Sequence, residues 1–135
     1  MNEVKLGISL LMEASFGMNT RTQGELGETL AADYLTKKGF LILDRNWTFG
    51  RLEIDIIAKK GGVLVFVEVK MRSNDYYGSP WKSVGSQKQR RLIRAANYYI
   101  QKKKQDADSR FDILSIVGNE DNYKIQHIEG AFYAV

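Results

Sequence analysis

The chain contains no cysteine and only one histidine, His127. The missing cysteines exclude disulfides, thiolate zinc sites and cysteine nucleophiles. A single histidine excludes a zinc site built on several histidines and a two-histidine phosphoesterase mechanism. A catalytic metal would therefore be held mainly by carboxylates, carbonyls and water, which favours Mg²⁺ or Mn²⁺ as the cofactor.

Long hydrophobic runs are also missing. No stretch approaches the ~20 apolar residues of a membrane span, and the apolar run over residues 6–12 is short and broken by Glu13. No convincing signal-peptide pattern surrounds it. We therefore expect a cytoplasmic protein with no membrane partner. With 135 residues, 44% of them hydrophobic, the chain suits a single domain over residues 21–135, preceded by a partly helical or disordered lead-in over residues 1–20.

Acidic residues are absent between Asp75 and Asp106, whereas eight basic residues lie there. That segment carries +8 and the rest of the chain −4, for a net charge of +4. One interpretation is a solvated helix face. The one-sided distribution favours the other, a surface for a polyanion such as DNA. The candidate nucleic-acid-binding residues here are Lys82, Lys88, Arg90, Arg91 and Arg94.

Hydrophobic periodicity predicts a helix, three strands, a second helix and two strands. The first helix covers residues 22–38, is capped by Thr20 or Thr22 and ends at Gly39. The third strand is apolar on both faces, so it should be central in its sheet. The fold class is therefore α/β, a mixed sheet of about five strands with helices on its faces. The other predicted elements are strands over residues 40–47, 52–59, 63–71, 111–117 and 122–129, and a helix over residues 86–104.

Charged residues interrupt the apolar pattern of two neighbouring strands. The turn Gly61-Gly62 predicts an antiparallel hairpin, and centring it between the two glycines pairs Asp55 with Glu68. Opposite residues in such a pair lie ~5 Å apart. Lys70 follows on the same face as Glu68, because side chains alternate along a strand.

Two adjacent carboxylates repel each other, and a divalent cation between them removes the conflict. Such an ion polarises a scissile phosphate, and Lys70 could orient or deprotonate an attacking water. We therefore predict a metal-dependent nuclease site with Asp55 and Glu68 as metal ligands. The alternative is a simple ion pair between Glu68 and Lys70, with Asp55 merely exposed.

Three further acidic residues and the histidine are weaker candidates. Glu28 lies at the margin of the apolar stripe of its helix, where it could point to the sheet edge as a metal or water ligand or form a rim ion pair. Glu25 is farther round the helix, and we expect it to be solvated or to support the site. Glu53 ranks below Asp55, and a lone strand histidine such as His127 is usually structural.

A series of short motifs resembles the YraN-type family of small bacterial proteins. The motifs occur in order at residues 24–28 (GELGE), 31–35 (AADYL), 38–40 (KGF), 45–47 (RNW), 53–58 (EIDIIA), 64–70 (LVFVEVK), 78–80 (GSP), 88–92 (KQRRL), 110–112 (RFD) and 127–129 (HIE). The resemblance covers about residues 22–132. That family is similar to archaeal Holliday junction resolvases and to the restriction-endonuclease-like fold of the PD-(D/E)xK nucleases.

The resemblance implies that Glu28, Asp55, Glu68 and Lys70 match the catalytic positions of the nuclease site, with Glu28 joining the two other carboxylates at the metal. Gln89 matches a further position that contacts substrate. One departure is Leu52, which stands where the family usually has a glycine, and this change could shift the register near Asp55.

The leading hypothesis is a Mg²⁺-dependent endonuclease for branched or structured DNA. Two alternatives stay open: a DNA-binding module of the same fold that does not cut, and an assembly partner that uses its basic face on an acidic protein. A junction-resolving enzyme would act as a homodimer, because its substrate has two equivalent strands to cut.

Overall fold

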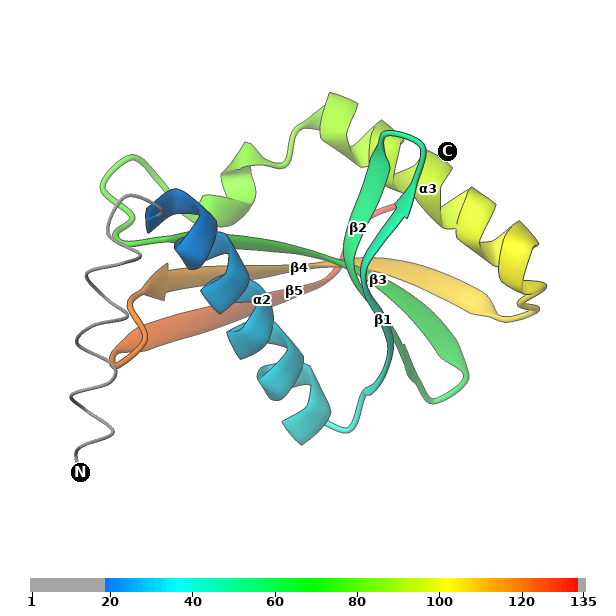
Figure 1. The fold of residues 1–135 in the computed structure, drawn as a ribbon, viewed down its shortest axis with the longest axis horizontal. Coiled ribbons are helices and arrows are strands. Elements are labelled where there is room, and N and C mark those ends of the chain that lie inside the picture. Colours follow the sequence, from blue (N-terminus) through cyan, green and yellow to red (C-terminus); the bar gives the residue numbers. More distant parts are fainter. Residues whose placement is uncertain (1–18, 134–135) are drawn as a thin grey trace.

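The structure is a computed structural model that describes residues 19–133. The lead-in predicted over residues 1–20 lies almost entirely outside them. The elements follow the predicted order of one helix, three strands, a second helix and two strands (Figure 1). They are α2 (Asn19–Lys37), β1 (Leu41–Phe49), β2 (Leu52–Lys60), β3 (Val63–Arg72), the 3₁₀ helix η2 (Pro80–Ser83), α3 (Ser86–Lys103), β4 (Asp108–Gly118) and β5 (Tyr123–Phe132).

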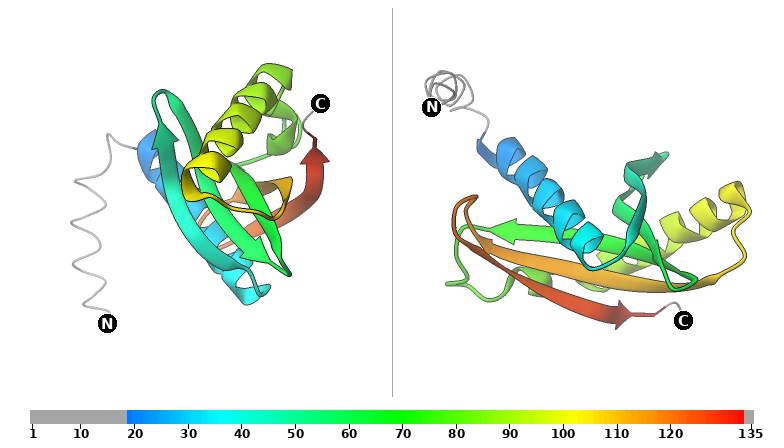
Figure 2. Two further views of the ribbon diagram at one scale, coloured as in Figure 1. Left: turned by 90° about the vertical axis from the view of Figure 1, so that its right-hand side faces the viewer. Right: turned by 90° about the horizontal axis from the view of Figure 1, so that it is seen from below.

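The five strands form one sheet in the order β1-β2-β3-β4-β5. The β3–β4 pair is parallel and the other three pairs are antiparallel, so the sheet is mixed, as predicted. Helices α2 and α3 lie on opposite sides of it (Figures 1 and 2). No helix in the described part of the chain is long and apolar enough to cross a membrane.

Strand β3 is central because its side chains are buried on both faces. Leu64 and Phe66 belong to the core beneath α3, whereas Val65 and Val67 belong to the core beneath α2. All four are at most 1% exposed. A strand covered on both faces has no polar alternation, which is why its sequence reads as a continuous apolar run.

Helix α2 ends at Gly39 for the predicted reason. Gly39 has a φ of 93°, which favours glycine. Its N–H donates to Thr36, and the N–H of Phe40 donates to Leu35, which is the pattern of a Schellman motif. The predicted start was wrong, since Thr20 and Thr22 lie inside the helix rather than before it.

The β2–β3 hairpin has the predicted turn and register. Gly61 and Gly62 have φ of 57° and 80°, as a two-residue I′ turn requires. Pairing runs from Lys60↔Val63 to Ile56↔Val67, and one more step of this register would set Asp55 opposite Glu68. Leu52 pairs with Phe49 at the far end of β2, so it does not disturb this register.

Before Ile56 in the chain, β2 does not pair with β3 and pairs only with β1. The β1–β2 hairpin therefore bends out of the sheet towards α3 (Figures 1 and 2). Asn46 lies at this bend with a φ of 52°, a conformation that few non-glycine residues adopt but that asparagine tolerates. The divergence of the two strands leaves the end of β3 open at one side.

Helix α2 lies close to β3 at Gly27. A Cβ atom placed there would lie 3.2 Å from the Cβ of Met71 and 3.6 Å from Val69. A Cβ at Gly24, one turn earlier, would meet nothing within 4 Å. The glycine at position 27 therefore sets the distance between the helix and the strand.

These two glycines give a matched test of that contact. Gly24→Ala should stabilise the protein by up to about 1 kcal/mol, because alanine is the better helix former. Gly27→Ala gains the same propensity but should lose about 1–3 kcal/mol to overpacking, since the Cβ of Met71 is fixed to the backbone. Urea denaturation of both variants measures the difference, and equal midpoints would show that the contact is not tight.

Candidate active site

A pocket of about 290 Å³ opens where β2 leaves β3. We call it the carboxylate pocket. Helix α2 lines one side of it, Asp55 of β2 and the C-terminal end of β3 form its floor, and the first turn of α3 closes it. It brings together the four predicted catalytic residues from three different elements. Its lining residues are Gln23, Gly24, Gly27, Glu28, Asp55, Glu68, Val69, Lys70, Met71, Arg72 and Lys88.

Asp55 and Glu68 meet at the centre of the pocket. The Oδ2 atom of Asp55 accepts a hydrogen bond of 2.8 Å from the backbone N–H of Val69. The carboxylate thus accepts a hydrogen bond from a backbone N–H of β3 at the point where β2 and β3 separate. The Asp55 and Glu68 carboxyl groups line the same pocket and interact, because the Asp55 carboxylate raises the pKa of Glu68.

Glu68 is the most buried acid of the pocket, with only 4% of its surface exposed. Burial, and next the charge of the neighbouring Asp55, raise the pKa of Glu68 to about 7. Lys88 and Lys70 oppose this shift, with their Nζ atoms 3.4 Å and 3.5 Å from Oε2 of Glu68. The pair thus sits beside two ammonium groups that can also face a phosphate.

Glu28 lies beside this pair on α2. Burial raises its pKa, and the Asp55 charge adds to the effect, while a hydrogen bond from Asn46 lowers it. Asn46 was not among the predicted site residues. The sequence gives only a faint sign of this role, which is an asparagine inside a predicted strand. Asn46 adopts a positive φ at the bend of β1, and its side chain reaches Glu28.

The donor set fits a hard divalent cation held by two protein carboxylates. Asp55 and Glu68 line one pocket and the charge of Asp55 raises the pKa of Glu68, so a cation between the two carboxylates would relieve their repulsion. Mg²⁺ is commonly bound by one or two carboxylates, with water and substrate phosphates completing its shell. Within residues 19–133, no three acidic or histidine side chains form a group that could hold a metal. Glu28 therefore flanks the pair without completing a three-carboxylate cluster.

The predicted nucleic-acid-binding residues do not all lie in one place. Lys88 belongs to the carboxylate pocket, where its ion pair with Glu68 was not foreseen. Lys82 lines an adjoining hollow that shares Gln23 and Arg72 with that pocket. The others follow along α3. Of these, Arg91 and Arg94 face the β1–β2 hairpin, and Arg90 is exposed. The side-chain amide of Gln89 donates a hydrogen bond of 3.1 Å to a backbone carbonyl of the loop before α3.

His127 belongs to a separate buried network around Asp112. The Asp112 side chain is fully buried. It accepts hydrogen bonds from Arg110 (2.8 and 3.0 Å) and from the Gly130 N–H (3.0 Å). Its Oδ2 atom also lies 2.7 Å from Nε2 of His127. The other ring nitrogen of His127 lies 3.2 Å from the Tyr34 hydroxyl on α2. This network ties α2, β4 and β5 together, in keeping with a structural histidine.

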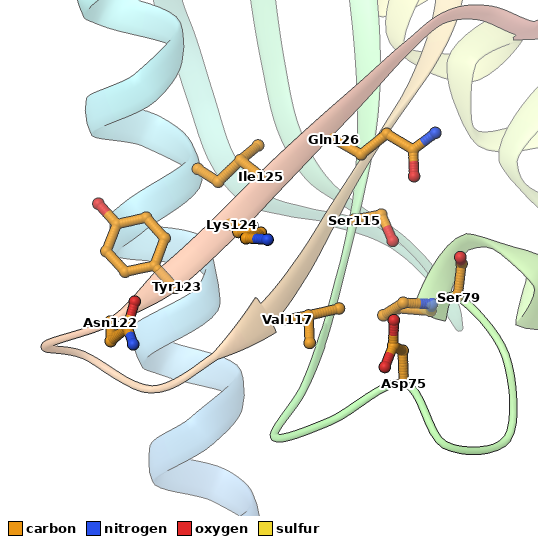
Figure 3. A pocket seen from close by; sticks show the side chains of 10 residues that line it. Asp75, Ser79, Ser115, Val117, Asn122, Tyr123, Lys124, Ile125 and Gln126 are labelled. Atoms are coloured by element: carbon orange, nitrogen blue, oxygen red, sulfur yellow. The ribbon is translucent and has the colours of Figure 1, made fainter.

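A further hollow of about 510 Å³ lies over β4 and β5 and contains none of the predicted catalytic residues. Asp75 and Ser79 of the loop lie on one side of it, and Ser115 and Gln126 of the strands lie on the other (Figure 3). Ser115 already accepts a hydrogen bond of 3.1 Å from the backbone of η2. The residues that line this hollow include no pair of carboxylates, so the metal-binding chemistry considered above belongs to the carboxylate pocket.

Comparison with known proteins places the chain in a family. Residues 27–116 match the uncharacterised protein family UPF0102, a range that includes all four predicted catalytic residues. A UPF0102 protein of Flavobacterium psychrophilum is 46% identical over 110 residues, which cover 82% of this chain and 92% of the relative. Similar relatives occur in Bacteroides thetaiotaomicron (44% over 110 residues, 82% and 91%) and Thermodesulfovibrio yellowstonii (46% over 110 residues, 82% and 95%). The chain belongs to the UPF0102 family.

Proposed function

We propose that this protein is a metal-dependent endonuclease that hydrolyses phosphodiester bonds in branched or structured DNA. The observation that carries the proposal is the Asp55–Glu68 carboxyl pair, with Lys70 and Lys88 within 3.5 Å of Glu68. Paired carboxylates that are withdrawn from water are costly for a fold. A cation and a phosphate together would satisfy all four groups.

Each residue then has a role that its position supports. Asp55 and Glu68 would hold Mg²⁺ or Mn²⁺, which when bound would polarise the phosphate and lower the pKa of a water. Lys70 is 24% exposed and would orient the attacking water or neutralise the phosphate oxygens. Lys88 would act as a second phosphate contact. Glu28, with its raised pKa, would accept a hydrogen bond from that water.

The substrate class rests on resemblance and charge. The YraN-type motifs are similar to those of archaeal Holliday junction resolvases and other nucleases of the restriction-endonuclease-like fold, and a mixed five-stranded sheet is compatible with that fold. The basic residues of α3 continue from the pocket along one helix. Because a junction has two equivalent strands, we include a homodimer in the proposal, to be measured by analytical ultracentrifugation with and without DNA.

Cleavage assays test the proposal directly. Four-way junctions, flaps and linear duplexes should be incubated with the full chain and Mg²⁺ or Mn²⁺, with EDTA as the control. We expect metal-dependent nicking of at least one branched substrate in preference to the linear duplex. Salt-sensitive binding without cleavage would instead indicate a binding module, and no DNA binding at moderate salt would favour a protein partner for the basic face.

A further inference from the structure

The tip of the β1–β2 hairpin and the exposed face of α3 form a second pocket, of about 510 Å³. We call it the hairpin pocket. It exists because the part of β2 before Ile56 does not pair with β3, so the hairpin tip reaches α3 (Figure 1). Its lining residues are Phe49, Gly50, Arg51, Leu52, Arg91, Arg94 and Tyr98.

Three arginines give this pocket a positive charge that nothing in it neutralises. Arg51 comes from the hairpin, and Arg91 and Arg94 come from α3. No acidic residue lines the pocket, and none of the three forms an ion pair with a carboxylate of residues 19–133. Guanidinium groups bind phosphate oxygens through two parallel hydrogen bonds, so the pocket suits one or two phosphates.

Two aromatic rings form the apolar part of the same pocket. The rings of Phe49 and Tyr98 stack with centroids 4.3 Å apart and an interplanar angle of 23°. Trp47 stacks behind Phe49 at 6.3 Å and 12°, which fixes the ring from the core side. Phe49 and Tyr98 are still about 40% and 39% exposed. An exposed ring next to arginines is the arrangement on which an unpaired base stacks.

A stripe along α3 connects the hairpin pocket to the carboxylate pocket. Lys88, Arg91, Arg94 and Tyr98 follow one another at spacings of three and four residues, so they lie on one helix face. With 1.5 Å of rise per residue, Arg94 lies ~9 Å and Tyr98 ~15 Å beyond Lys88 along the helix axis. A nucleic-acid strand advances about 3.4 Å per nucleotide in a duplex, so these distances correspond to roughly three or four nucleotides.

We propose that the hairpin pocket binds an unpaired nucleotide of the DNA strand a few positions from the phosphate at Asp55 and Glu68. The arginines would hold its phosphates, and its base would extend the stack of Tyr98 and Phe49. This inference rests on the proposed nuclease function for the identity of the strand. Because the pocket lies outside the carboxylate site, its binding does not require the metal.

Fluorescence anisotropy in EDTA tests the pocket without cleavage. The probes are a labelled oligo-dT of about 12 nucleotides and a blunt duplex of the same length. Tyr98→Leu keeps an apolar side chain but loses the ring, whereas Tyr98→Phe keeps the ring. Arg94→Gln removes one charge in the pocket, and Lys124→Gln removes one charge from the exposed face of β5, at the opposite edge of the sheet. Thermal melting checks that every variant is folded.

Tyr98→Leu should weaken oligo-dT binding at least about fivefold, the lower limit expected for loss of one stacked base. Arg94→Gln should also weaken it at least about fivefold, because it removes a charge-assisted hydrogen bond to a phosphate. Tyr98→Phe and Lys124→Gln should stay within about twofold of the wild type, a difference below the scale of one stacked base. The inference is overturned if Tyr98→Leu binds oligo-dT as the wild type does, if both charge variants weaken it equally, if duplex binding falls as much, or if the wild type does not bind oligo-dT.

The two proposals fail separately in these experiments. A wild type that cuts branched DNA while Tyr98→Leu binds oligo-dT normally would refute the hairpin pocket and leave the nuclease function intact. A wild type that never cuts, but whose single-strand binding depends on Tyr98 and Arg94, would refute the nuclease function alone.

Discussion

Asp55→Asn should abolish metal-dependent DNA cleavage, with a loss of at least about 10²–10³-fold. A metal that polarises the phosphate supplies several kcal/mol of transition-state stabilisation, and each 1.36 kcal/mol is a factor of ten in rate. The substitution should spare the fold, because an asparagine oxygen can still accept the 2.8 Å bond from the Val69 N–H. Asp33→Asn, an exposed acid on α2 that pairs with Lys37, is the control and should cut normally.

Isothermal titration with Mn²⁺ separates loss of metal from loss of structure. The wild type and Asp33→Asn should bind the ion, whereas Asp55→Asn should show no binding heat. Lys70→Met should bind Mn²⁺ but cut at least about a hundredfold more slowly, since the lysine acts on the water or the phosphate rather than on the metal. Lys124→Met is its control. Undiminished cleavage by Asp55→Asn would place the reaction outside the carboxylate pocket.

The hairpin turn and the central strand were predictable because local sequence determines both. Gly61 and Gly62 are the residues that a I′ turn requires, and such a turn fixes the pairing of every residue that follows it. The apolar run of β3 required cover on both faces, and α2 and α3 provide that cover. The register that brings Asp55 towards Glu68 follows from these two features alone.

The surroundings of the carboxylates were not predictable in the same way, because they depend on where the sheet stops. Strand β2 pairs with β3 only from Ile56 onwards, and no residue pattern in β2 marks that point. Its consequences are tertiary: Asn46 reaches Glu28, and the hairpin tip reaches Arg91 and Arg94. Lys88 was likewise assigned to a DNA-binding face by its charge alone, whereas helix packing directs it to Glu68.

The network around Asp112 leads to the second large effect, on stability rather than activity. Asp112→Asn should lower the free energy of unfolding by about 3 kcal/mol, the usual cost of removing one partner from a buried ion pair. The fully buried carboxylate accepts bonds from Arg110 and Gly130 and lies against His127, and an amide cannot satisfy all these donors. Urea denaturation measures the change, and Asp108→Asn, at an exposed position of the same strand, should shift it by less than about 0.5 kcal/mol.

The pH dependence identifies the charge as the cause. Burial alone would raise the pKa of Asp112, but hydrogen bonds from His127, Arg110 and the Gly130 N–H outweigh it and lower the pKa below its ordinary value. A carboxylate with a lowered pKa stabilises the fold above about pH 4, and that stability is lost as the pH falls through the folded-state pKa. The gap between wild type and Asp112→Asn should therefore be widest near neutral pH and narrow in acid. A gap that is constant from pH 7 to about pH 3 would mean that packing around residue 112, and not its charge, stabilises the junction of α2, β4 and β5.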